Sequence, residues 1–130
     1  MESRSSEGAL QPHVLSCLEE LQEELHGLAK RKGWYDDPET EAQFVNRACA
    51  NLHDEVSEFH EAFREDRLWK PCDKAEKMEF PLNCAEEELA DLVIRAFDMA
   101  GKLQVNLANA IRVKHLYNSS RPYRHGGKLA

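Results

Sequence analysis

Apolar positions recur every three or four residues along most of the chain, and this spacing predicts helices. No segment alternates with period two, and Val, Ile and Thr are scarce, so a β-sheet is not expected. Four amphipathic segments stand out, and we expect helices over residues 12–32, 38–67, 84–100 and 105–119. Four helices joined by short links favour an all-α fold of the four-helix-bundle type.

Capping signals mark the expected helix ends. Asp37 before Pro38 fits the start of the second helix, and Asn83 with Glu86 three residues later resembles a capping box. Gly33 and Gly101 are typical stops. The charged run at 73–79 predicts a short helix.

The spacing also predicts which helix faces are buried. The expected core stripe of the second helix is Phe44, Ala48, Leu52, Phe59 and Phe63. In the third helix it is Leu89, Leu92, Val93, Ala96 and Ala100. A second apolar strip on the third helix could meet another subunit, and it consists of Ala90, Ile94, Phe97 and Gly101.

Two pairs of carboxylates do not fit a simple solvated surface. On a helical wheel, Glu55 falls inside the apolar arc of the second helix and Glu58 falls on its edge. The third helix carries Glu88 and Asp91 at the same spacing of three. An ionised carboxylate facing a core is costly unless it is paired or binds a metal. Four carboxylates suit Mg²⁺, or Mn²⁺ as a substitute, whereas neither pair ends in the His of di-iron bundles. The alternative is that all four are ordinary exposed acids.

The composition limits the classes of protein that remain. The chain has 130 residues, which predicts one domain, with residues 1–11 as a flexible tail, 12–121 as the helical domain and 122–130 as a basic tail. The formal net charge of −7 argues against binding to duplex nucleic acid. No membrane span and no secretory signal are expected. Four cysteines without a CxxC spacing indicate a reducing, cytoplasmic setting.

The C-terminal part carries the opposite charge. Lys114 and Asn118 lie one turn apart, Arg121 follows the last helix, and the tail adds His125 and Lys128. Lys, Arg and Asn side chains suit phosphate oxygens, although an ordinary basic tail has the same composition. An acidic cluster suited to a metal and a basic cluster suited to phosphate together match a nucleoside triphosphate with Mg²⁺.

Several segments of the chain resemble segments of one known family, and their order along the chain agrees with that of the family. Asp54-Glu55-Val56-Ser57-Glu58, followed by Glu88-Leu89-Ala90-Asp91, resembles the split ExxE…ExxD motif of the MazG-like nucleotide pyrophosphohydrolases, in the all-α NTP pyrophosphatase superfamily. Residues 32–37 (KGWYDD), 94–101 (IRAFDMAG) and 114–128 (KHLYNSSRPYRHGGK) resemble further family segments. The resemblance runs from about Leu25 to Lys128.

This resemblance implies a fold, a reaction and a set of residue roles. It implies a MazG-like fold assembling into a dimer or tetramer, and Mg²⁺-dependent hydrolysis of a (deoxy)nucleoside triphosphate between the α and β phosphates, as nucleotide-pool house-cleaning. The metal ligands would be Glu55, Glu58, Glu88 and Asp91. Lys114, Asn118 and Arg121 would hold the phosphates or the sugar, with Trp34 near the nucleotide. Family tendency points to a deoxypyrimidine such as dCTP.

The general base stays open at this stage. The family often has Glu-Glu at the start of the first motif, and here the first position is Asp54, one methylene shorter. Asp54 is therefore one candidate, and Glu55 or Glu58 could share the role.

Other interpretations compete with this one. Trp34 and Trp69 each either stack on a base or cap the end of the bundle, and capping is favoured for Trp69. His53-Asp54 is similar to the dipeptide of HD-domain phosphohydrolases, with His26 and Asp98 as the further ligands such a site needs. An acidic helical protein that only oligomerises or serves as an adaptor is the non-enzymatic alternative.

Overall fold

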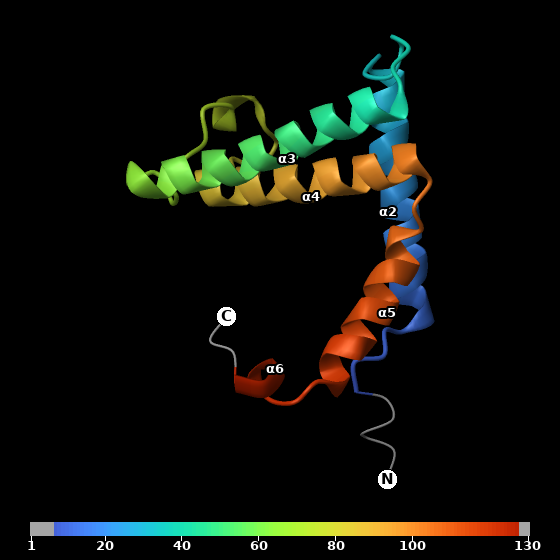
Figure 1. Cartoon of the computed structure of the whole chain (residues 1–130). Coiled ribbons are helices and arrows are strands. Elements are labelled where there is room, and N and C mark those ends of the chain that lie inside the picture. The colour runs from blue at the N-terminus through green and yellow to red at the C-terminus, as the bar shows by residue number, and fades with distance from the viewer. Residues whose placement is uncertain (1–6, 128–130) are drawn as a thin grey trace.

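The structure is a computed structural model that describes residues 7–127, and it is all-helical as expected (Figure 1). Four long helices account for most of the chain: α2 (Pro12–Arg31), α3 (Glu41–Arg64), α4 (Cys84–Leu103) and α5 (Leu107–Ser120). A 3₁₀ turn, η1 (Ala75–Lys77), and a short helix, α6 (Arg124–Gly127), complete the described part. None of the helices described is long and apolar enough to cross a membrane.

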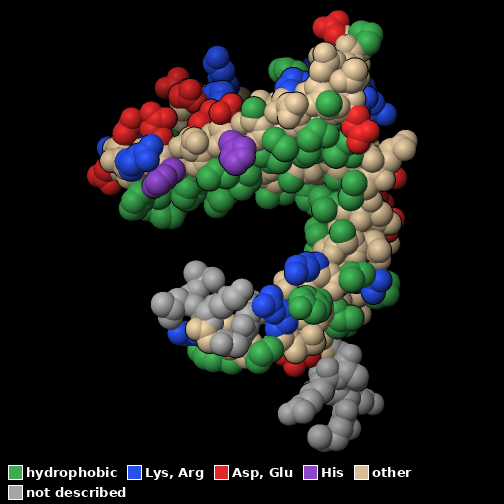
Figure 2. Space-filling model, viewed as in Figure 1, with side chains coloured by type: hydrophobic (Ala, Val, Ile, Leu, Met, Phe, Trp, Pro, Cys, Tyr) green, Lys and Arg blue, Asp and Glu red, His purple; other side chains and the backbone are tan. Residues whose placement is uncertain are grey.

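The long helices form two arms and not one closed bundle. The α3–α4 arm is an antiparallel pair that crosses one end of α2, and the α2–α5 arm runs away from it at a wide angle (Figure 1). The turn after α4 directs the chain into the second arm, because Gln104 adopts a left-handed backbone with φ 58° and α5 then follows α2. A single chain therefore leaves a broad gap between its arms (Figure 2).

Side-chain caps set the starts of α3 and α4. The Asn83–Glu86 capping box is confirmed, with Glu86 N donating to Asn83 Oδ1 at 2.8 Å and Asn83 N donating to Glu86 Oε1 at 3.0 Å. The expected start at Asp37 and Pro38 is wrong. Thr40 caps α3 instead, because its hydroxyl and the Gln43 side chain bond reciprocally to each other's backbone N–H.

Gly101 does not stop α4, which continues to Leu103. The glycine is needed for helix packing instead. A Cβ at this position would lie 2.6 Å from Cβ of His26 on α2, which is closer than two carbon atoms can approach. The absence of a side chain therefore allows α4 to cross α2 at close range.

The buried face of α4 matches the expected one only in part, because Ala100 is buried but other members of the stripe are exposed. Phe97, which also reads as a core residue, is buried, whereas Ala90 and Ile94 of the same strip are exposed. Leu89 and Val93 of the expected core stripe are 52% and 48% exposed, and Phe63 of α3 is 62% exposed. Because α4 packs on both α2 and α3, no single apolar strip accounts for its buried residues.

The segment between α3 and α4 folds back onto the arm. Cys72 N donates to Leu82 O at 2.9 Å and Cys84 N donates to Lys70 O at 3.0 Å. The two thiols are buried in a small apolar cluster with Ala62 and Ala75. The short helix expected at 73–79 is present as η1. Trp69 does not cap the end of the helices, because it is 77% exposed.

The close approach of α4 to α2 predicts opposite effects for two glycine substitutions. Gly101→Ala is expected to lower the free energy of unfolding by about 1–3 kcal/mol, because the new methyl group meets the rigid Cβ of His26. Gly27→Ala on α2 meets only the flexible end of Arg31, and it is expected to raise stability by up to about 1 kcal/mol through helix propensity. Urea denaturation followed by circular dichroism measures both, and equal effects would contradict the packing.

Candidate metal centre and adjoining cavity

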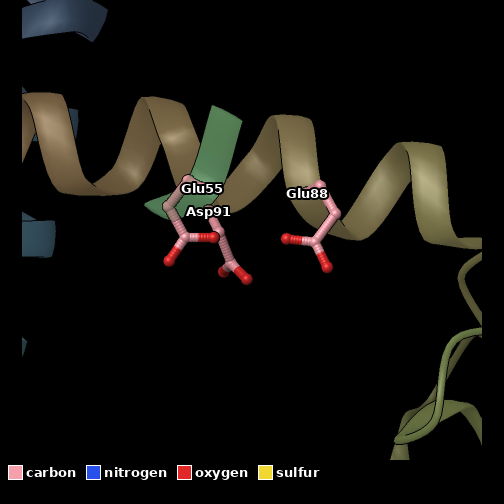
Figure 3. A group of neighbouring side chains, drawn as sticks. All are labelled: Glu55, Glu88 and Asp91. Carbon is pink, nitrogen blue, oxygen red and sulfur yellow. The ribbon is translucent and has the colours of Figure 1, made fainter. Parts of the chain in front are cut away.

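Carboxylates from two helices meet in the α3–α4 arm. Glu55 of α3 and Glu88 and Asp91 of α4 each bring one oxygen to within 4.8 Å of the others (Figure 3). These are three of the four residues expected as metal ligands. The fourth, Glu58, is exposed one turn after Glu55, and its carboxylate is close enough to Glu88 to perturb that group.

The helical pattern explains why the carboxylates converge. Glu55 was expected inside the apolar arc of its helix, and it is only 4% exposed. Glu88 and Asp91 lie about one turn apart on α4, and the α3–α4 packing brings this turn beside Glu55. The residues therefore form a cluster because two helices each place acidic side chains at a shared interface.

Few protein groups neutralise these carboxylates. Arg95 Nε donates to Glu55 Oε1 at 2.5 Å. Within residues 7–127, the other oxygen of Glu55 and one oxygen of Glu88 are buried without a hydrogen-bond donor. The neighbouring Glu87 is also buried, and it accepts a hydrogen bond from Lys74 Nζ at 3.0 Å.

The excess negative charge shifts the pKa values of the cluster. Burial, followed by the hydrogen bond and the charge of Glu58, raises the pKa of Glu88 to about 8. Burial, followed by the charge of Glu55, raises the pKa of Asp91. Glu88 and Asp91 thus favour a bound proton, and a bound metal ion would offset the same excess of negative charge.

A cavity of about 500 Å³ adjoins the cluster and lies among α2, α3 and α4. Asp91 and Arg95 belong to both the cavity wall and the carboxylate region. Trp34 also lines the cavity and is 70% exposed. Apolar walls, an exposed aromatic ring and a few convergent polar groups are typical of small-molecule sites, and the volume lies in their usual range.

A hydrogen-bonded triad supports the part of the cavity remote from the cluster. Asp98 accepts from the Tyr35 hydroxyl at 2.7 Å and lies 2.8 Å from Nδ1 of His26. Burial and the hydrogen bond to Asp98 raise the pKa of Tyr35, so the phenol stays protonated. The triad ties the loop that carries Trp34 to α2 and α4.

The basic residues expected at the phosphates lie on the other arm. Lys114 and Asn118 are exposed on α5 and Arg121 follows it, with the Lys114 and Arg121 cations over the Tyr117 ring. The chain does not bring them to the carboxylates (Figure 1). The side chain of His125 and the whole of Lys128 fall outside the described residues. Asp54, the other candidate base, is exposed on α3.

The residues needed for an HD-type site do not assemble. His53 and Asp54 are exposed on α3, and His26 and Asp98 meet about 10 Å further along α4 from Asp91. Among the residues that the structure describes, Glu55, Glu88 and Asp91 form the one group of acidic, His or Cys side chains with metal-site spacing.

Sequence reasoning did not assign Arg95 or Glu87 to the site, and it named Asp98 only as a ligand of the HD-type alternative. Arg95 and Asp98 follow Asp91 by four and seven residues, so all three share one face of α4. Extending the acidic motif along that face would have found both. Glu87 gives no comparable signal, because its burial depends on how the 65–83 segment folds back.

Comparisons of the chain with family models, with curated proteins and with solved structures found no match.

The raised pKa of Glu88 predicts a pH dependence of stability in the presence of a chelator. The unfolded chain ionises this carboxyl near pH 4.5 and the folded chain only near pH 8, so the free energy of unfolding should fall as the pH rises through this interval. Glu88→Gln should flatten the fall, whereas Glu86→Gln, which removes an exposed capping carboxylate, should leave it in place. Thermal unfolding across pH in EDTA measures the difference, and an unchanged profile in Glu88→Gln would contradict the assignment.

Proposed function

We propose that this chain is a Mg²⁺-dependent nucleoside triphosphate pyrophosphohydrolase that releases a nucleoside monophosphate and pyrophosphate. The observation that supports this most strongly is the junction of a carboxylate cluster with a cavity of nucleoside size, joined at Asp91 and Arg95. The resemblance of the acidic and basic motifs to MazG-like enzymes supplies the reaction class. A deoxynucleotide such as dCTP is the substrate to test first.

The donor set of the cluster fits a hard divalent cation. Glu55, Glu88 and Asp91 offer carboxylate oxygens, and two of the buried oxygens lack any donor in the described part of the chain. Glu58 would complete the set from its exposed position next to Glu88. A Mg²⁺ ion held by these carboxylates would lower the pKa of a bound water molecule and neutralise phosphate charge.

Acid–base chemistry is assigned to the exposed edge of the cluster. Glu58 is reachable from solvent and adjoins Glu88, so it is placed to accept a proton from an attacking water molecule. Asp54 is exposed too, but its side chain is one methylene shorter than that of a glutamate. It precedes the buried Glu55 and lies on the solvent-exposed side of α3. We therefore assign the base to Glu58 rather than to Asp54.

Substrate orientation is assigned to the cavity. The exposed ring of Trp34 offers a surface on which a base can stack, and apolar side chains line the cavity beside it. The triad of His26, Tyr35 and Asp98 holds that wall in place. The nucleoside then lies in the cavity and its phosphates extend toward the carboxylates.

The proposed site needs a second copy of the chain. Leaving groups that carry the charge of pyrophosphate require cations, and Lys114, Asn118 and Arg121 lie on the other arm. Hydrophobic side chains gather on the face of the α3–α4 arm that borders the gap (Figure 2), and the exposed apolar residues of the chain include Leu89, Val93 and Leu116. We infer a homo-oligomer in which the α5 residues of one copy reach the carboxylates of another.

The adaptor alternative rests on the same exposed apolar side chains. They would serve a purely structural oligomer equally well. An adaptor, however, gains nothing from buried carboxylate oxygens without donors, which cost stability in the absence of a ligand. The enzyme is therefore the better-supported proposal.

Release of pyrophosphate tests the reaction. The purified protein is expected to release it from at least one canonical deoxynucleoside or nucleoside triphosphate in Mg²⁺ and not in EDTA. Glu58→Ala, Glu55→Gln and Asp91→Asn should each lower the rate at least about 100-fold, because they remove metal ligands or the base.

Glu61→Gln is the matched control, because this glutamate is exposed on the same helix outside the cluster, and it should leave the rate unchanged. A folded protein that releases no pyrophosphate from any of these nucleotides, or full activity in Asp91→Asn, would overturn the proposal.

Complementation tests the shared site. Asp91→Asn and Lys114→Ala chains should each be nearly inactive alone. When they are co-expressed with different tags and purified through both, about a quarter to a half of the wild-type activity should return, since one class of site then has both residues intact. Recovery that is no better than the sum of the two single variants would show that each chain builds its site alone.

A further inference from the structure

Arg95 stands at the boundary between the carboxylate cluster and the cavity. It follows Asp91 by one turn of α4, and its side chain lines the cavity. The side chain is 45% exposed although its ion-pair partner Glu55 is buried. It therefore reaches from the protein interior into the space where a ligand would bind.

The hydrogen bonding of this guanidinium is incomplete. Its Nε donates to Glu55 Oε1 at 2.5 Å. Within residues 7–127, neither of its two terminal nitrogens makes a hydrogen bond to the protein. An arginine has five N–H donors in a rigid planar fork, so four of them stay available while the fifth orients Glu55.

Two other cations, Lys32 and Arg47, line the cavity, and neither makes an ion pair with the carboxylate cluster in the described residues. Arg47 bonds to both carboxylate oxygens of Glu39, at 2.6 and 3.3 Å. Lys74 is held by the buried Glu87. In the described part of the chain, Arg95 is the one cation that both contacts the carboxylate cluster and lines the cavity.

We propose that Arg95 binds the phosphate attached to the nucleoside, with its terminal nitrogens on two phosphate oxygens while its Nε holds Glu55. This inference rests on the proposed function and assigns one phosphate of the substrate to this chain's own arm. A nucleoside in the cavity directs its 5′-phosphate toward the boundary that Asp91 and Arg95 define. The outer phosphates then extend toward the α5 residues of a second copy.

A single arginine can perform both tasks because of its shape. The fork matches a phosphate bidentately on one edge and leaves Nε free to bond to a carboxylate on another. Arg95 thus makes the position of Glu55 depend on whether a phosphate is bound. A lysine at 95 supplies one point charge and cannot hold both partners.

Paired ligands that differ by one phosphate test this role. Binding of the four deoxynucleoside 5′-monophosphates and of the four matching deoxynucleosides is measured by calorimetry in Mg²⁺. For wild type, the monophosphate with the best-bound base should bind more tightly than its nucleoside. In Arg95→Gln this preference should fall about 10- to 100-fold, the usual effect of losing a charge-assisted bidentate contact, while nucleoside affinity stays unchanged.

Two further variants keep the test decisive. Arg47→Gln also changes a cavity arginine, but one bound by Glu39, and it should leave the preference for the monophosphate unchanged. Arg95→Lys retains the positive charge beside Glu55 and should show an intermediate loss, which covers the case in which Arg95→Gln fails to fold.

The outcomes separate the two proposals. An unchanged monophosphate preference in Arg95→Lys and Arg95→Gln, in a protein that still hydrolyses triphosphates, would overturn the role of Arg95 alone. If Arg95→Gln lowers the affinities for the nucleoside and for the monophosphate equally, the role of Arg95 is also overturned. A wild-type protein that binds none of the eight ligands and releases no pyrophosphate would overturn the proposed function together with this inference.

Discussion

The packing of α3 against α4 brings together carboxylates that repel one another, and this electrostatic constraint governs the site. Glu55 is buried, and one arginine donates to it, while oxygens of Glu55 and Glu88 remain without donors in residues 7–127. An apolar pair of helices would pack more favourably at these positions. The cost of clustering these carboxylates is understandable if the cluster is a binding site. A bound proton or metal ion neutralises their charge and relieves the repulsion.

A second constraint is the small core of a single chain. Among the described residues no large side chain is fully buried, and the long helices form two arms instead of closing around one core. Leu89, Val93 and Phe63 are exposed, although helical periodicity places them on faces that were expected to be buried. A monomer of this shape buries little apolar surface, so association with a second copy would add the stability that the open arms lack.

The sequence predicted local features well and relations between helices less well. The all-α class, the Asn83 cap and the burial of Glu55 follow from spacing and capping within one helix, and all three are confirmed. The face of α4 that packs inward was predicted only in part, since Ala100 is buried but Leu89 and Val93 are exposed. It depends on the crossing with α2 at Gly101, where a glycine that resembles a stop signal serves as a contact point. Periodicity detects apolar strips, but it does not say which partner covers each one.

The face of α4 that begins at Asp91 connects these constraints to chemistry. Asp91, Arg95 and Asp98 recur at steps of four and three along that face. Asp91 belongs to the carboxylate cluster, Arg95 adds a cation at the boundary, and Asp98 anchors the loop that carries the exposed Trp34. An acidic end, a cationic middle and an aromatic-lined end follow the order of a metal ion, a phosphate and a base in a nucleotide. A protein that bound a metal alone would have no use for the second and third positions, and it is their alignment with the first that favours a nucleotide.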